Sequence, residues 1–70
     1  MKLSKLEISL VENYSFVLSK KNNSWRRGQC FFNALLIMFP EVAEFIRGTE
    51  YDPFYNNDII DKCKAKITKL

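Results

Sequence analysis

The sequence contains no histidine, and its two cysteines, Cys30 and Cys63, are not arranged in a Cys-x-x-Cys pair. A metal site within one chain usually needs three or four His, Cys or carboxylate ligands, so we expect no metal centre. No imidazole base is available, and no serine or cysteine stands beside an evident activating group. The sequence therefore shows no nucleophile paired with a base, as nucleophilic catalysis requires. The sequence therefore predicts a protein that is not an enzyme and that needs no cofactor.

Long apolar runs are missing as well. The longest, residues 34–39, is far shorter than the roughly 20 residues that a membrane-spanning helix needs. The apolar positions near the N-terminus are interrupted by charged and polar side chains, which is not typical of a signal peptide. We therefore expect a cytoplasmic protein that does not contact a membrane and whose thiols are reduced.

A strong charge of either sign is also absent. The formal net charge is only +3, and acidic residues are interspersed with basic ones through most of the chain. Proteins dedicated to nucleic-acid binding usually carry a larger or more segregated basic excess. Nucleic acid is therefore the second choice of partner, behind another protein.

Apolar side chains are what the chain has in excess. Hydrophobic residues make up 47% and aromatic residues 14% of only 70 residues, which indicates one folded domain over residues 1–70. A domain of this size buries only about 60% of the surface that its unfolded chain exposes. We therefore expect a homodimer, or a partner that covers the remaining apolar surface.

The first helix is expected from Lys5 to about Lys20. Ser4 and Glu7 have the spacing of a capping box, in which each side chain accepts a hydrogen bond from the backbone of the other. A stripe of apolar residues at helical spacing, flanked by Val11 and Leu18, should face the core: Leu6, Leu10, Tyr14 and Val17. Apolar residues also alternate here as in a strand, but the capping box and the length of the segment favour a helix.

A second helix is expected from Trp25 to Met38 or Phe39, capped by Ser24 after a polar turn. Its end is predicted by Pro40, which disfavours the helical conformation in the residue before it. The helix is apolar on almost every side, so it should lie at the centre of the domain.

A third, short helix should begin at Pro40 and end at Gly48, with an inner stripe of Val42, Phe45 and Ile46. A fourth should follow from Asp58, with an inner stripe formed by Ile59, Ile60, Cys63, Ile67 and Leu70. The segment between them has no periodicity and should be an ordered loop. The predicted fold class is thus all-α, a small domain of about four short helices with an ordered Arg-Gly-Thr to Asp-Pro-Phe-Tyr loop.

Several residues around this loop suggest a structural clamp, and they are Gly28, Gln29, Asn33, Arg47, Gly48 and Asp52. A glycine inside a helix indicates close approach of another backbone, and Gly48 should adopt a positive φ. Gln29 and Asn33 share a helix face and can bond the loop. Arg47 is spaced for a surface pair with Glu44 and can also clamp Asp52 or loop carbonyls. Ligand binding is the alternative role for these side chains.

The partner-binding surface is expected among aromatic and basic residues, namely Trp25, Arg26, Arg27, Tyr51, Phe54 and Tyr55. Trp, Tyr and Arg are enriched among the residues that contribute most to protein interfaces. The segment from Lys20 to Arg27 also combines aromatic and basic side chains that can stack on bases and hold phosphates.

Residues 25–55 contain two patterned runs, W-R-x-G-Q-x-x-F-N-x-L and P-E-x-A-x-x-I-R-G-T-x-x-D-P-F-Y. These runs resemble a family of short uncharacterised proteins from tailed bacteriophages and prophages. The resemblance transfers no activity of its own. Together with the small size, the surplus aromatic surface and the missing catalytic groups, it suggests an accessory protein that binds and modulates a host protein, chiefly by inhibition, in defence, transcription or nucleic-acid processing. The alternative is a small helical nucleic-acid-binding module that uses the cluster from Lys20 to Arg27.

Overall fold

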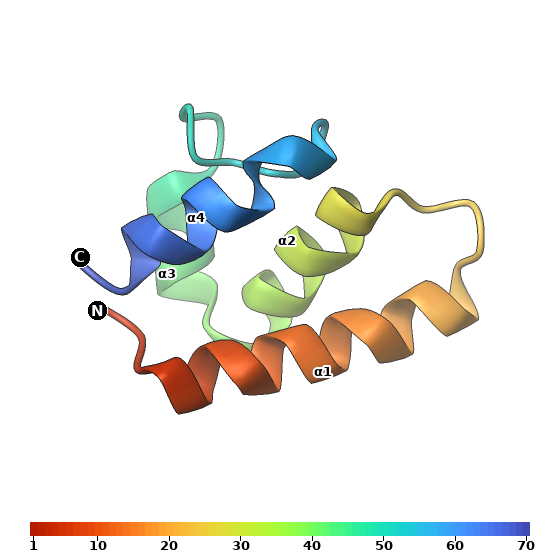
Figure 1. Ribbon diagram of the computed structural model, residues 1–70, viewed down its shortest axis with the longest axis horizontal. Coiled ribbons are helices and arrows are strands. Elements are labelled where there is room, and N and C mark those ends of the chain that lie inside the picture. The colour runs from red at the N-terminus through yellow and green to blue at the C-terminus, as the bar shows by residue number, and fades with distance from the viewer.

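A computed structural model describes all 70 residues as four α-helices and one short 3-10 helix, with no strand. The elements are α1 (Lys5–Lys21), α2 (Arg27–Met38), α3 (Pro40–Ile46), η1 (Asn57–Ile59) and α4 (Ile60–Ile67). In Figure 1, α1 runs along one edge of the molecule, and α2 lies between α1 and the blue segment that carries η1 and α4. The all-α fold expected from the sequence is confirmed.

The capping box at the start of α1 forms as predicted. The Ser4 N–H donates to Glu7 Oε1 at 2.8 Å, and the Glu7 N–H donates to Ser4 Oγ at 3.1 Å. Together these bonds satisfy backbone donors that the first turn of a helix leaves free. Residues 5–21 are therefore helical, and the strand alternative is wrong.

The buried face of α1 includes the expected flanking positions Val11 and Leu18, but it leaves out most of the main stripe that the sequence suggested. Ile8, Val11 and Leu18 are buried and Tyr14 is half-buried, whereas the other expected positions, Leu6, Leu10 and Val17, are exposed. Helix α1 carries two apolar stripes, and both have helical spacing. Periodicity alone cannot choose between them, because the choice depends on which stripe meets α2.

Helix α2 begins at Arg27, two residues later than expected, and Ser24 does not cap it. The Trp25 N–H donates to the Asn22 carbonyl at 2.9 Å, so residues 22–25 form a separate turn before the helix. The end of the helix is as predicted, because Phe39 is its C-cap and Pro40 starts α3. Helix α2 is central and contributes Cys30, Phe31, Phe32, Ala34 and Leu35 to the core.

The two remaining helices largely confirm their predicted inner faces. In α3, Val42 and Ile46 are buried, but Phe45 is 54% exposed and Ala43 takes the inward position instead. In α4, the buried residues are Ile60, Cys63 and Ile67. A 3-10 turn, η1, precedes α4, and the Asn56 side chain accepts a hydrogen bond from the Asp58 N–H at its start.

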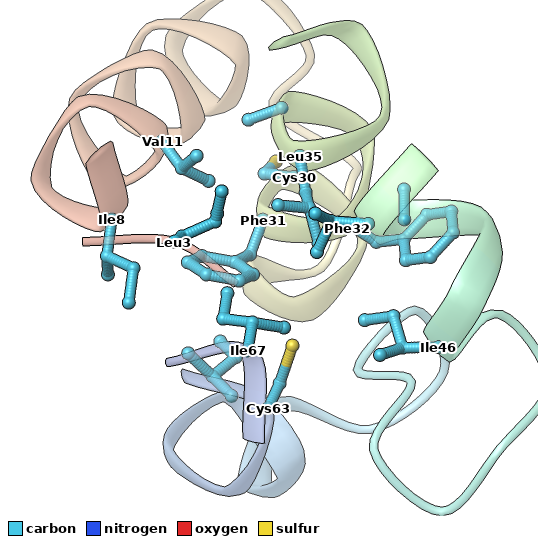
Figure 2. Packing of buried hydrophobic residues seen from close by; sticks show 14 of the residues in the cluster. Leu3, Ile8, Val11, Cys30, Phe31, Phe32, Leu35, Ile46, Cys63 and Ile67 are labelled. Atoms are coloured by element: carbon cyan, nitrogen blue, oxygen red, sulfur yellow. The ribbon is translucent and has the colours of Figure 1, made fainter. Parts of the chain in front are cut away.

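The core is one cluster of 15 buried residues, drawn from all four helices and from Leu3, which precedes α1. Figure 2 shows residues of α1, α2 and α4 converging around Phe31 and Ile67. The Leu3 N–H donates to the Ile67 carbonyl at 2.8 Å, which ties the two ends of the chain together. None of the helices is long and apolar enough to span a membrane.

Candidate functional site

The loop after α3 is organised by Asp52. One carboxylate oxygen accepts from the Gly48 N–H at 2.7 Å, and the other accepts from the Phe54 N–H at 2.9 Å. Gly48 has a φ of 74°, as the sequence predicted, and this left-handed residue lets the chain leave α3 sharply. The carboxylate therefore holds both ends of a tight turn through charge-assisted hydrogen bonds.

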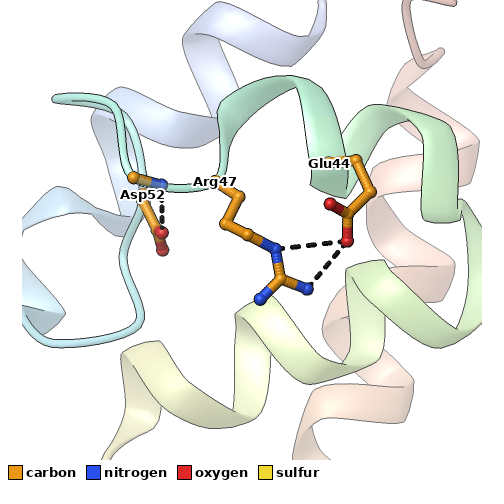
Figure 3. Close-up of polar contacts among 4 residues, drawn as sticks. Glu44, Arg47 and Asp52 are labelled. Atoms are coloured by element: carbon orange, nitrogen blue, oxygen red, sulfur yellow. Dashed lines mark hydrogen bonds and ion pairs between the residues drawn. The ribbon is translucent and has the colours of Figure 1, made fainter.

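Arg47 does not clamp Asp52, and that prediction is wrong. Its Nη2 and Nε atoms lie 2.8 and 3.2 Å from Glu44 Oε1, and no bond to a loop carbonyl forms. Figure 3 shows the guanidinium bonded to Glu44 and directed away from Asp52. The surface pair of Glu44 with Arg47 that the i, i+3 spacing predicts is thus confirmed, while backbone amides already occupy both oxygens of Asp52.

Gly28 is the point where the loop meets α2. A Cβ at this position would lie 1.9 Å from the Pro53 carbonyl oxygen and 3.3 Å from that of Asn56. The Gly28 N–H also donates to Asn57 Oδ1 at 2.8 Å. The close backbone approach predicted for this glycine is thus confirmed, and Asn57 is a loop-holding residue that the sequence reasoning missed.

Gln29 and Asn33 do not hold the loop. Both are half-buried, and neither forms a hydrogen bond with residues 47–57. Gly28 and Phe32 face the loop, and each following residue is rotated by about 100° around the helix axis. This rotation directs Gln29 and Asn33 elsewhere, so their predicted role in the clamp is wrong.

The tie that the sequence assigned to Arg47 is made by Arg26. Its Nη2 and Nε atoms donate to the Phe54 carbonyl at 3.1 and 3.3 Å, across 28 residues of sequence. The guanidinium carbon also lies 5.9 Å from the Phe54 ring centroid and 5.6 Å from that of Tyr55, within cation–π range. Arg26 thus links the start of α2 to the end of the loop.

Arg26, Phe54 and Tyr55 together form a surface that we call the Arg26–Tyr55 patch. The Phe54 ring packs edge-to-face on Tyr55 at 4.8 Å and on buried Phe32 at 5.9 Å. Tyr55 is 81% exposed. A hollow of about 210 Å³ lies beside the patch and is lined by Phe32, Arg47, Gly48, Asp52, Phe54 and Tyr55. The patch therefore exposes the Tyr55 ring and the Arg26 guanidinium, and both contact the Phe54 ring, which packs on the core residue Phe32.

The other three residues expected at the partner surface lie elsewhere. Trp25 is half-buried and packs against the core. Tyr51 has the ammonium groups of Lys62 and Lys66 at 5.4 and 5.0 Å from its ring centroid. Arg27 lines a separate groove between α1, α2 and α4. Only half of the predicted partner set is thus brought together.

The thiols have no access to a reaction partner in this fold. Cys30 and Cys63 are both fully buried, as small core residues are. Burial raises the pKa of both thiols, and for Cys63 burial together with the charge of Asp52 raises the pKa to about 12. Both thiols are therefore protonated at neutral pH, where a thiol is a weak nucleophile.

No family model matches the chain, and comparisons with curated proteins and with solved structures find no match. The resemblance of residues 25–55 to bacteriophage proteins stays a prediction.

We expect Asp52→Ala to destabilise the protein more than Arg47→Ala. The first change removes the acceptor of two backbone bonds worth about 1.5–3 kcal/mol, which corresponds to a drop in Tm of roughly 6–24 °C. The second removes an ion pair whose side chains are 51% and 58% exposed and a cation–π contact with Phe32 at 5.2 Å, each worth about 1 kcal/mol or less. Thermal denaturation followed by circular dichroism gives the Tm of both variants. A larger drop in Tm for Arg47→Ala than for Asp52→Ala would show that Arg47 is the clamp.

Proposed function

We propose that this protein acts without catalysis, by binding another protein through the Arg26–Tyr55 patch. The resemblance to bacteriophage proteins supports a bacterial host protein as the partner, from defence, transcription or nucleic-acid processing. An 8.3 kDa protein that occupies a functional surface of such a partner would inhibit it. Both thiols are buried and the chain has no histidine, and these two facts support a binding role over a catalytic one.

The observation that carries this proposal is that Tyr55 is exposed and yet held in place. Its ring packs on Phe54 and lies under the Arg26 guanidinium, and Phe54 in turn packs on the core residue Phe32. An aromatic side chain ordered before binding loses little conformational entropy when a partner covers it. Tyr and Arg at one spot are also the residues that most often contribute the largest share of binding energy.

The test is a comparison of capture from a bacterial host lysate by the wild-type protein and by Tyr55→Ala and Arg26→Ala variants. A residue at the centre of an interface costs about 2 kcal/mol or more when truncated, so we expect at least a roughly 30-fold loss of affinity. Quantitative mass spectrometry identifies proteins lost from the captured set, and titration with the purified protein gives the Kd.

Phe45→Ala is the matched control for this test. Phe45 is an aromatic residue on α3, 54% exposed, and forms no aromatic or cation–π contact with the patch. The Phe45→Ala variant should capture the same proteins as the wild type. Equal capture by the wild type, Tyr55→Ala and Arg26→Ala would contradict the proposal.

A second candidate function, nucleic-acid binding, is favoured by four neighbouring cations that form no ion pair. They are Lys20, Lys21, Arg26 and Arg27, and all four are exposed. If all four neutralise phosphates of duplex DNA, log Kobs should fall against log[salt] with a slope of about −3.6. A mobility-shift titration at several salt concentrations tests this. Sub-micromolar binding with that slope would replace the protein-binding proposal.

A further inference from the structure

The Arg26 guanidinium is held in place without being neutralised. Its Nε and Nη2 atoms donate to the Phe54 carbonyl, which is a neutral acceptor, and the cation lies 5.6 Å from the Tyr55 ring centroid. Arg26 forms no ion pair, whereas the same two nitrogens of Arg47 bond to the Glu44 carboxylate. A tie to a carbonyl needs only N–H donors, so the fold does not account for the positive charge of Arg26.

The free edge of this guanidinium matches the geometry of a carboxylate. Arginine has five N–H donors, and the bonds to Phe54 use the edge formed by Nε and Nη2. The outer edge, formed by Nη1 and Nη2, stays available, and Arg26 is exposed. Two parallel N–H groups fit the two oxygens of a carboxylate, and such charge-assisted bonds are about twice as strong as neutral ones. Because the guanidinium is already fixed, it loses little entropy on binding.

The charges around Arg26 favour a single carboxylate over a chain of phosphates. The segment that carries Phe54 and Tyr55, residues 50–61, contains no basic residue and four acidic ones, namely Glu50, Asp52, Asp58 and Asp61. Glu50 and Asp61 are paired with lysines, whereas Asp52 and Asp58 are not. A nucleic acid that crossed the patch would bring its phosphates onto this acidic segment, which repels them. An acidic side chain of a protein needs to approach Arg26 alone.

We propose that Arg26 recognises an aspartate or glutamate side chain of the partner protein. This inference rests on the proposed function, because it names the chemical group that the Arg26–Tyr55 patch binds. The carboxylate accepts two N–H bonds from Nη1 and Nη2, in the plane of the guanidinium. The Tyr55 ring, which is 81% exposed, gives apolar contact to the residues beside that carboxylate. The matching surface of the partner is therefore acidic at one point and apolar around it.

A random peptide display library is the probe for this contact, selected on the wild-type protein and counter-selected on Tyr55→Ala. We expect the peptides that depend on Tyr55 to share an aspartate or glutamate at one position. Selection on Arg26→Gln, which keeps an amide donor but has no charge, should lose this preference. Arg27→Gln is the matched control, because it removes the same charge from the next residue, whose side chain lines a different groove. It should select the same acidic peptides as the wild type.

Exchange of the acidic residue of one selected peptide for its amide measures the contact itself. This exchange should weaken binding to the wild-type protein roughly 10-fold or more, as expected for a lost hydrogen bond between charged groups. It should change binding to Arg26→Gln much less, because that variant lacks the cation. Isothermal titration calorimetry gives the four Kd values. The wild-type half of the comparison needs no variant protein, so it stands even if Arg26→Gln folds poorly.

The possible results separate this inference from the proposed function. Peptides that depend on Tyr55 but share no acidic residue would overturn the role of Arg26 and leave protein binding by the patch intact. A library that yields no peptide dependent on Tyr55 would overturn both. Displacement of a selected peptide by a duplex oligonucleotide at physiological ionic strength would show that Arg26 binds phosphates, and it would also overturn the inference.

Discussion

Replacing Gly28 by alanine is expected to lower the free energy of unfolding by about 3 kcal/mol, which corresponds to a drop in Tm of roughly 12–24 °C. The added Cβ would lie 1.9 Å from the Pro53 carbonyl oxygen. That oxygen belongs to backbone, so the whole loop must move, and the Gly28 bond to Asn57 would be strained with it. In an open helix the same change would instead stabilise by about 1 kcal/mol.

Gly48→Ala is the matched control for this experiment. A methyl group added at Gly48 would meet no other atom within 4 Å, so only the φ of 74° opposes a side chain there. That conformation costs an alanine about 1 kcal/mol, clearly less than the clash at Gly28. Chemical and thermal denaturation of both variants gives the comparison. A Gly28→Ala protein as stable as the wild type would mean that the loop does not pack on α2.

Alkaline pH is expected to lower the free energy of unfolding, because the buried Cys63 thiol loses its proton less readily in the folded state than in the unfolded state. In the folded state the pKa of this thiol is about 12, whereas its ordinary value is 9.0. Because the folded state holds the proton more tightly, the stabilisation is complete below pH 9 and is lost as the pH rises toward 12. At 1.36 kcal/mol per pH unit, the loss approaches about 4 kcal/mol at pH 12.

Cys63→Ala isolates this effect from the other groups that titrate in the same range. Lys62 and Lys64 also have raised pKa values because they pair with Glu50 and Glu12, and these pairs loosen in alkali in both proteins. The variant should be less stable at pH 7, because it leaves a small cavity, but its stability should fall less steeply between pH 9 and 11. Parallel urea titrations measure the two slopes. Equal slopes would contradict a buried, protonated Cys63.

Local sequence signals were sufficient for most of the secondary structure. The capping box at Ser4, the proline at position 40 and Gly48 each act within four or five residues, through hydrogen bonds and backbone sterics that need no other part of the chain. Gly28 was also recognisable, because a helix seldom keeps a glycine without a close neighbour. The identity of that neighbour, the Pro53 carbonyl, could not be predicted from the sequence.

The candidate site depended on tertiary structure. Helix spacing alone places Glu44 beside Arg47, but Arg26 bonds the Phe54 carbonyl across 28 residues of chain. Asn57 reached Gly28 from a comparable separation. Such partners depend on how α2 and the loop pack against each other, and no local pattern encodes that geometry.

Four helices around one apolar core follow from the amino-acid sequence without further information, because helix periodicity, caps and breakers are local properties. The face of each helix that the core uses follows instead from packing between distant segments. Both stripes of α1 have helical spacing, but packing against α2 buries Ile8, Val11 and Leu18. The same packing leaves Leu6, Leu10 and Val17 in solvent, because a helix side chain is buried only where another element lies against it.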